Sequence, residues 1–325
     1  MADNEAHSAV FAERLLSGKV ALVTGGGTGL GKESAIELAR CGARVVIAGR
    51  RAETLEAATE EILRAIGADA DEPREIATGA GGGSADAGET ATGRVDWVAA
   101  DVREPADARC LVETVVERRG RLDMLVNNAG GQYFTPAEGI ALKGWRAVWR
   151  LNVEGMLNMS EAAVELGLGG PRSPGAVAEG GTIVNVTLSP HHGMPGMAHS
   201  GAARATVEAL TRELAERWSD RGVAVTAIAA GHFDTEAMGK YPETVRAGMA
   251  RSVPMQRLGE PREHAWLVAL LCSPLGRALN GSTITLDGAR DNWFGPWPPP
   301  GLTGGTGEVP TEERKGARAG GGASA

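Results

Sequence analysis

A short apolar run that leads through glycines into a helical pattern is the feature that most constrains this chain. Residues 19–24 (KVALVT) lead directly into Thr24-Gly25-Gly26-Gly27-Thr28-Gly29-Leu30-Gly31, and an amphipathic stretch follows. Gly25 permits a tight turn, Gly29 allows a phosphate to approach the backbone, and Gly31 allows close helix packing. The first N–H groups of a helix lack intrahelical partners and attract anions. The segment therefore predicts a strand, a turn and a helix that bind a pyrophosphate.

The rest of the chain alternates β-branched runs with longer amphipathic segments. Seven runs are predicted to be strands: 19–24, 43–48, 94–100, 121–127, 181–186, 222–229 and 282–287. Helical patterns between such runs are typical of βαβ units, in which the strands are parallel. A chain of 325 residues with 42% hydrophobic content can bury one full core of this kind. We expect an α/β fold: a single doubly wound Rossmann-type domain with a seven-stranded parallel sheet.

This domain is expected to span residues 17–292, after an N-terminal extension at 1–16. Two segments within it, about 67–93 and 167–180, are rich in Gly, Ala, Pro and Ser and are predicted to be flexible insertions in surface loops. A Pro/Gly-rich tail, 293–325, follows the domain.

The amino-acid composition limits the classes of partner that this protein is expected to bind. A formal net charge of -8 and a pI near 5.4 argue against binding to nucleic acid, which normally needs a concentrated basic surface. The three cysteines form no C-x-x-C pair, and the histidines have no carboxylate or cysteine at ligand spacing, so neither a disulfide framework nor a metal site is expected. No apolar run reaches the ~18 residues of a membrane span, and the C-terminal residues match no peroxisomal address. We expect a cytoplasmic protein with a small-molecule partner and no membrane partner.

The end of the second strand indicates which dinucleotide would bind. A carboxylate there would take the ribose 2′-hydroxyl of NADH, but this strand ends Ala48-Gly49-Arg50-Arg51. Arg50 is suited to a charge-assisted contact with a 2′-phosphate, and Arg51 adds charge. The alternative is that both arginines only begin a solvated helix at 52–66. The expected cofactor is NADPH.

The spacing T-G-x-x-x-G-x-G resembles the fingerprint of the short-chain dehydrogenase/reductase superfamily. The resemblance implies that Asp101-Val102 contact the adenine and that Gly231 and Thr235 hold the nicotinamide carboxamide. In the run Asn127-Asn128-Ala129-Gly130 it implies that Asn mostly steadies strands, a largely structural role, while Ala129 and Gly130 line the cofactor. Helix capping is the structural alternative for Asp101 and Thr235. The expected cofactor-binding residues are Thr24, Gly25, Thr28, Gly29, Leu30, Gly31, Arg50, Asp101, Val102, Asn128, Ala129, Gly130, Arg204, Gly231 and Thr235.

The catalytic positions depart from the superfamily pattern of Asn, Ser, Tyr and Lys. Asn152 matches the Asn, which kinks its helix, but Ser200 stands where Tyr is usual and Arg204 where Lys is usual. A serine hydroxyl is far too weak an acid to replace a phenol with a pKa of about 10. Thr187 and Ser189 are candidates for a hydroxyl near the family Ser, with loop capping as the alternative. Of the two tyrosines, Tyr133 and Tyr241, the second lies where the superfamily has a mobile substrate lid and could swing in.

The run His199-Ser200-Gly201-Ala202-Ala203-Arg204 and the motif NNAGGQ at 127–132 resemble peroxisomal trans-2-enoyl-CoA reductases over about 16–290. The resemblance implies NADPH-dependent hydride transfer to Cβ of a trans-2-enoyl thioester in fatty acid metabolism, in which the carbonyl oxygen needs only a hydrogen bond. The expected catalytic residues are Asn152, Ser200, Arg204 and Thr187. The alternatives are a dehydrogenase or reductase acting on a 3-oxoacyl or other carbonyl substrate, and a non-catalytic NADP-binding protein. By analogy, helices near 142–165 and 202–218 would pair in a homotetramer or dimer.

Overall fold

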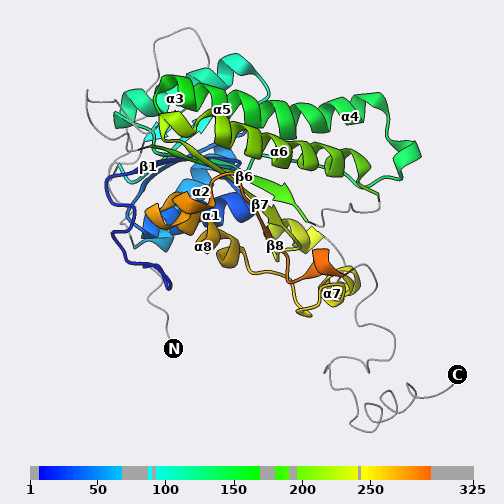
Figure 1. Ribbon diagram of the computed structural model, residues 1–325. Helices are drawn as coiled ribbons and strands as arrows, with labels where there is room; N and C mark the ends of the chain where they lie inside the picture. The colour runs from blue at the N-terminus through cyan, green and yellow to red at the C-terminus, as the bar shows by residue number, and fades with distance from the viewer. Residues whose placement is uncertain are drawn as a thin grey trace, which may run out of the picture.

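A computed structural model describes residues 7–67, 87–89, 93–168, 180–189, 196–240 and 243–293. The described part is an α/β domain in which one twisted sheet separates two layers of helices (Figure 1). Residues 1–6 of the expected N-terminal extension, most of both insertions, and all but the first residue of the tail lie outside the described residues.

The sheet has the strand order β3-β4-β2-β1-β5-β6-β7-β8. The strands are β1 (Val20–Thr24), β2 (Arg44–Gly49), β3 (Ala87–Glu89), β4 (Val95–Ala99), β5 (Met124–Asn127), β6 (Thr182–Leu188), β7 (Ala224–Ala230) and β8 (Thr283–Leu286). All of the adjacent pairs are parallel except β3 with β4. The seven expected parallel strands are therefore confirmed.

Strand β3 was not expected, because it lies within the segment predicted to be a flexible insertion. Its three residues pair antiparallel with β4, with Ala87 opposite Val98 and Glu89 opposite Asp96. A Gly/Ala-rich segment has little strand propensity of its own, and here the free edge of β4 supplies the hydrogen-bond partners. The sequence analysis, which predicted a flexible insertion here, did not foresee this short strand.

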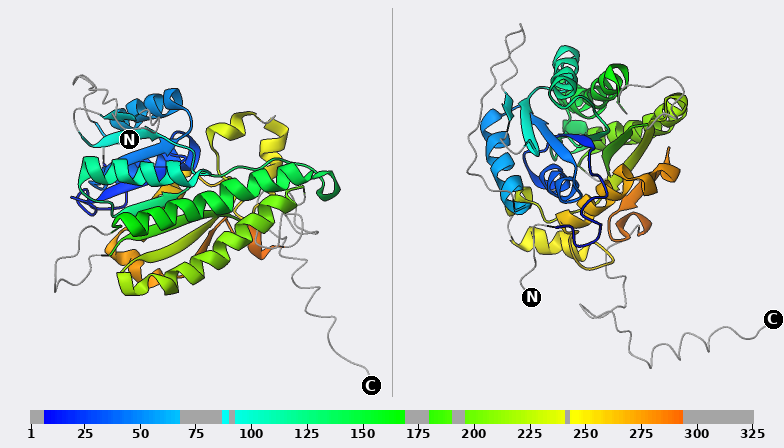
Figure 2. Two further views of the ribbon diagram at one scale, coloured as in Figure 1. Left: turned by 90° about the horizontal axis from the view of Figure 1, so that it is seen from above. Right: turned by 90° about the vertical axis from the view of Figure 1, so that its left-hand side faces the viewer.

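Helices cover both faces of the sheet. They are α1 (Gly29–Arg40), α2 (Ala52–Ala65), α3 (Pro105–Arg119), α4 (Leu142–Trp149), α5 (Gly155–Leu166), α6 (Ala198–Arg217), α7 (Glu243–Arg251) and α8 (Pro261–Cys272). Short helical turns are η1 (Ala137–Gly139), η2 (Arg150–Glu154), η3 (Ser219–Arg221), η4 (Glu236–Lys240), η5 (Pro274–Leu279) and η6 (Arg290–Asn292). One layer contains α3, α5 and α6, and the other contains α1, α2 and α8 (Figures 1 and 2).

The alternation of side chains along β1 shows how the sheet joins the two halves of the core. Val20 and Leu22 pack in the cluster with α3, α5 and α6, whereas Ala21 and Val23 pack in the cluster with α1, α2 and α8. Both faces are covered, so all five residues of β1 are buried, and the strand reads as a continuous apolar run.

Local signals set the ends of several helices. α3 begins with Pro105, whose missing N–H is not needed in a first turn, and ends at Gly120 with φ of 75°. α8 begins with a capping box, in which the Glu263 side chain accepts the backbone N–H of Glu260 at 2.8 Å.

Strand β1 lies between β2 and β5, so the chain passes to opposite halves of the sheet at this point. In open parallel sheets, ligands bind beyond the carboxyl ends of the strands at such a switch point. Within the described ranges, no helix is both long and apolar enough to cross a membrane.

Candidate active site

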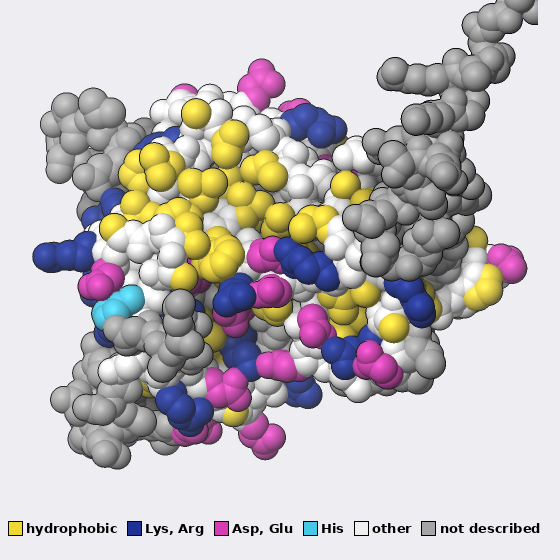
Figure 3. Space-filling view, turned by 90° about the horizontal axis from the view of Figure 1, so that it is seen from below, with side chains coloured by type: hydrophobic (Ala, Val, Ile, Leu, Met, Phe, Trp, Pro, Cys, Tyr) yellow, Lys and Arg dark blue, Asp and Glu magenta, His cyan; other side chains and the backbone are white. Residues whose placement is uncertain are grey.

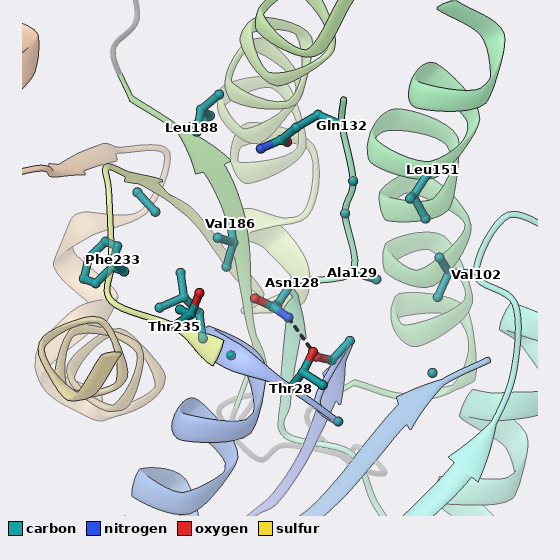
Figure 4. A pocket seen from close by; sticks show the side chains of 18 of the residues that line it. Thr28, Val102, Asn128, Ala129, Gln132, Leu151, Val186, Leu188, Phe233 and Thr235 are labelled. Carbon is teal, nitrogen blue, oxygen red and sulfur yellow. Dashed lines mark hydrogen bonds between the residues drawn. The ribbon is translucent and has the colours of Figure 1, made fainter. Parts of the chain in front are cut away.

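A cleft of about 830 Å³ lies at the carboxyl ends of the strands (Figure 4). Most of the predicted site residues line it: Gly25, Thr28, Gly29, Leu30, Arg50, Asp101, Val102, Asn128, Ala129, Gly130, Thr187, Arg204, Gly231 and Thr235. Four predicted residues are not on its wall, and these are Thr24, Gly31, Asn152 and Ser200. Sequence segments far apart in the chain thus form one continuous surface.

The glycine loop has no room for side chains where a phosphate would lie. Gly25 has φ of 65°, and a Cβ added to it would lie 2.9 Å from the Asn128 amide nitrogen. A Cβ added to Gly31 would lie 2.4 Å from the carbonyl oxygen of Gly25. Thr28, the N-cap residue of α1, makes no side-chain capping hydrogen bond, so the first N–H groups of α1 are left for a ligand.

Thr24 supports this loop from behind the cleft. Its buried hydroxyl donates to the carbonyl oxygen of Val126 at 3.2 Å and accepts the backbone N–H groups of Asn128 and Ala129, each at 3.1 Å. Asn128 in turn donates its side-chain amide to the carbonyl oxygens of Thr24 and Gly25. The two loops that would hold the cofactor are therefore fixed to one another.

Charged residues gather at the end of the cleft next to β2 and β4. Arg50 and Arg51 are exposed on its wall, with no carboxylate at the end of β2. Asp101 accepts the Arg103 Nε–H at 2.8 Å through one oxygen and at 3.0 Å through the other. The hydrogen bonds from Arg103 hold the pKa of Asp101 below its usual value, and the charge of Arg50 acts in the same direction. Arg103 is a partner of Asp101 that the sequence motif did not reveal.

Asn152 lies in the π-helical turn η2, between α4 and α5. Its amide nitrogen donates to the carbonyl oxygens of Val148 at 2.7 Å and Gly131 at 2.9 Å, and its amide oxygen accepts the Gly131 N–H at 3.2 Å. The helix expected over 142–165 is thus interrupted at the residue that was predicted to kink it. Asn152 holds the loop after β5 in place from behind the cleft.

Arg204 of α6 forms part of the cleft floor. Its Nη1 donates to the carbonyl oxygen of Val186 at 2.7 Å, and a Cβ added to Gly130 would lie 2.3 Å from its Nη2. Its Nε is buried without a hydrogen-bond partner in the part of the chain that the structure describes. Burial lowers the pKa of Arg204 to about 10, so the side chain stays positive at neutral pH. A buried cation whose Nε has no partner among the described residues favours an electron-rich ligand here.

Ser200 is fully buried one turn before Arg204 on α6. Its hydroxyl donates to the Gln132 side-chain oxygen at 3.3 Å. Gln132 lines the cleft (Figure 4). Because its oxygen accepts from Ser200, the Gln132 amide nitrogen is left to donate into the cleft. Gln132 is a candidate ligand residue that the sequence analysis placed only within a motif.

The hydroxyl groups expected near the reacting centre have other partners. The buried Thr187 hydroxyl donates to Glu208 Oε1 at 2.9 Å, and the Ser189 hydroxyl donates to Asp287 Oδ2. Leu188, between them, points into the cleft (Figure 4). The geometry therefore differs from the expectation for Thr187, because its one proton is already donated to a carboxylate on α6.

Tyr133, the one tyrosine among the described residues, does not direct its hydroxyl to the cleft floor. Tyr133 lines the mouth of the cleft, but its hydroxyl lies against α4, where a Cβ added to Gly144 would lie 1.9 Å from it. The Tyr133 ring meets the ring of His199 edge-on, with centroids 4.5 Å apart. Burial lowers the pKa of His199, which is neutral at pH 7. Tyr241 lies outside the described residues.

The glycine loop, the supporting threonine and the unpaired donors fit a dinucleotide. Two family models match the sequence, short chain dehydrogenase over residues 19–77 and Enoyl-(Acyl carrier protein) reductase over residues 76–289. The chain belongs to the short-chain dehydrogenase/reductase family. The fold of this family binds a nicotinamide cofactor, and the cleft described above is where it would lie.

Relatives within the family include proteins named as reductases of unsaturated acyl-CoA esters and proteins named as reductases of 3-oxoacyl groups. The chain is 34% identical to a probable 2,4-dienoyl-CoA reductase, (2E)-enoyl-CoA-producing, of Bacillus subtilis (strain 168), over 86% of this chain and 98% of that protein. It is 28% identical to a 3-oxoacyl-(acyl-carrier-protein) reductase of Thermotoga maritima, over 84% of this chain and 98% of that protein.

Solved structures agree with the fold. A citronellol catabolism dehydrogenase of Pseudomonas aeruginosa PAO1 superposes with a TM-score of 0.69 at 34% identity, covering 88% of this chain and all of that one. A short chain dehydrogenase of Burkholderia cenocepacia J2315, solved in complex with NADP, superposes with a TM-score of 0.68 at 29% identity, covering 84% of this chain and 98% of that one.

Proposed function

We propose that this protein uses NADPH to reduce the C2=C3 double bond of a trans-2-enoyl thioester. The observation that carries the proposal is the pair Ser200 and Gln132, which offers a hydrogen-bond donor, but no phenol, to a ligand above Arg204. The bound dinucleotide would supply a hydride, which goes to Cβ. Conjugate reduction then requires the protein only to stabilise negative charge on the thioester oxygen, and a proton from water goes to Cα to complete the saturated product.

Three side chains at the cleft would have different roles in stabilising this negative charge. Gln132 would donate its amide N–H to the thioester oxygen, and Ser200 would hold the amide in the required orientation. The Arg204 guanidinium, beneath Gly130, would hold the nicotinamide ribose and stabilise the enolate through its charge. A single well-placed donor of this kind is worth roughly 100- to 1,000-fold in rate.

The far end of the cleft suits an acyl chain. Its wall carries Leu188, Phe233, Met197, Met238 and Met249, all apolar. Thioether side chains are flexible and adapt to chains of different shape.

The preference for NADPH rests on the exposed Arg50 and the lack of a carboxylate at the end of β2. The 2′-phosphate would meet a cation where the 2′-hydroxyl of NADH would need an acceptor. The NADP complex of the Burkholderia relative supports the same choice.

A second candidate substrate is a 2,4-dienoyl thioester, because the Bacillus relative is named as a probable reductase of that class. The chemistry demanded of Gln132, Ser200 and Arg204 is the same for both. A 3-oxoacyl substrate, as the name of the Thermotoga relative would suggest, is less well supported. Reducing a ketone requires an acid at the alkoxide, and no tyrosine of the described residues faces the cleft floor.

The test is the initial rate of NADPH oxidation by the purified protein. Trans-2-decenoyl-CoA, a 2,4-decadienoyl-CoA and acetoacetyl-CoA are offered separately, with NADH as the cofactor control. We expect turnover of one or both unsaturated esters and a large preference for NADPH. Turnover of acetoacetyl-CoA alone would refute conjugate reduction, and NADPH binding without turnover of any ester would favour the non-catalytic alternative.

A further inference from the structure

One ammonium group connects three parts of the chain beside the cleft. Lys32 lies in the first turn of α1, and its side chain is only 15% exposed. Its Nζ donates to Glu61 of α2 at 2.5 Å and also to Glu236, the first residue of η4. Glu61 and Glu236 are each about half exposed, so the lysine is the buried centre of the arrangement.

A lysine is not expected at this point on electrostatic grounds alone. The N-terminal turn of a helix carries partial positive charge, so a cation there is unfavourable unless carboxylates compensate it. Burial also lowers the pKa of Lys32, but the hydrogen bonds from Glu236 and Glu61 outweigh that effect and leave the pKa above its usual value. Both carboxylates are thus paired with a charged ammonium at neutral pH.

Glu236 directly follows Thr235, which lies on the wall of the cleft. Thr235 packs against the glycine loop, because a Cβ added to Gly29 would lie 3.7 Å from Thr235 Cβ. Gly29 itself has φ of 53°, a backbone conformation that favours glycine. The Lys32–Glu236 bridge therefore connects the chain immediately after Thr235 to α1, the helix whose N-terminus would bind a pyrophosphate.

We propose that Lys32 is a positioning residue for the nicotinamide end of the bound dinucleotide. Through Glu236 it holds Thr235 and the start of η4 against α1, so that the carboxamide contact is already formed when the cofactor enters. Glu61 stabilises the lysine but belongs to α2, which carries no part of that contact. The proposal rests on the nicotinamide role of Thr235 and is independent of the acyl substrate.

The two carboxylates provide a matched pair of variants. Glu236→Gln and Glu61→Gln each remove one anion from the same ammonium, while Lys32→Met removes the bridge and Lys32→Arg keeps a cation. The affinity of each variant is measured for NADPH, by its fluorescence on binding, and for 2′-phospho-ADP-ribose, which lacks the nicotinamide. Neither measurement requires an acyl substrate.

We expect Glu236→Gln and Lys32→Met to weaken NADPH binding by about 3- to 10-fold, the range of a partly buried ion pair that couples two parts of a site. Binding of 2′-phospho-ADP-ribose should stay within about two-fold in every variant, and Glu61→Gln and Lys32→Arg should leave both ligands unchanged at this level.

Equal losses in Glu61→Gln and Glu236→Gln would overturn the proposal. A second result would also overturn it: Lys32→Met binds both NADPH and 2′-phospho-ADP-ribose more weakly, while Glu236→Gln binds them more tightly. That result would mean that Lys32 contacts the phosphates itself. If the wild type binds NADH more tightly than NADPH, the cofactor assignment fails on its own, and the same series with NADH and ADP-ribose still tests the role of Lys32.

Discussion

At the scale of single residues, Arg204 is the position where we expect a substitution to affect the proposed reaction much more than the stability of the fold. Its guanidinium is buried, which lowers its pKa to about 10, and it makes one described hydrogen bond, to Val186. Replacing a buried cation by an apolar side chain of similar size is often neutral or stabilising. The residue is therefore better explained by what it does for a ligand than by what it does for the fold.

Arg204→Met should lower kcat on the active ester by about 100-fold, because charge stabilisation of the enolate is lost. Its melting temperature without ligands should stay within a few degrees of that of the wild type. Arg204→Lys, which keeps the charge, should recover part of the rate. An unchanged kcat in Arg204→Met would remove the residue from the mechanism.

The motif residues could be placed on the cleft from the sequence because strand, turn and helix patterns are local. Side-chain partners were harder to foresee. The Thr187 hydroxyl was assigned to catalysis, yet its partner is Glu208, 21 residues away, and Gln132 meets Ser200 across 68 residues. Such pairs depend on how elements pack, which a single sequence does not show.

At the scale of elements, the interface between α1 and α8 contains a histidine that should respond to acid. His264 is fully buried, and its Nδ1 lies 3.2 Å from the Ser34 hydroxyl. Burial lowers its pKa to about 4. The pKa of a histidine in the unfolded chain is about 6.5. Between that pH and the folded pKa of about 4, the unfolded chain binds a proton that the folded chain does not. The contribution of neutral His264 to the free energy of unfolding is therefore complete above pH 6.5 and is lost as the pH falls toward 4.

Between pH 6.5 and 4, the wild type should lose up to about 3 kcal/mol more in free energy of unfolding than His264→Leu. Urea denaturation at a series of pH values measures this difference, and the carboxylates common to both proteins cancel. His7→Gln, which removes an exposed histidine, is the control and should follow the wild type. Parallel curves for the wild type and His264→Leu would contradict the assignment.

The elements themselves were largely predictable. Seven strands were expected within three residues of their observed ends, because buried parallel strands are continuous apolar runs. Two features were not expected in full. Strand β3 exists through pairing with β4, and the π-helical turn at Arg150–Glu154 depends on the hydrogen bonds of Asn152 to the loop after β5.

At the scale of the whole molecule, apolar side chains are exposed on two separate surfaces. Figure 3 shows such side chains gathered on the face that carries α8, and Leu275, just after α8, is 65% exposed. On the other surface, Leu142 and Trp149 of α4 are 64% and 39% exposed. Exposed apolar surfaces mark candidate interfaces, and a tetramer with two-fold axes can be built through two separate surfaces.

We therefore expect a dimer or tetramer by light scattering. Leu142→Asp should disrupt association through α4, and Leu275→Asp should disrupt association through the α8 face, so that a tetramer would become a dimer with either change and a monomer with both. A monomeric wild type at micromolar concentration would contradict this expectation.

The most direct test of the account follows the hydride itself. Reduction of trans-2-decenoyl-CoA with NADPH deuterated at the transferred position of C4 should place one deuterium at C3 of the saturated product and one solvent hydrogen at C2, read by mass spectrometry and NMR. Absence of deuterium from that product, together with deuterium at the carbinol carbon when acetoacetyl-CoA is the substrate, would show that the enzyme reduces carbonyl groups instead.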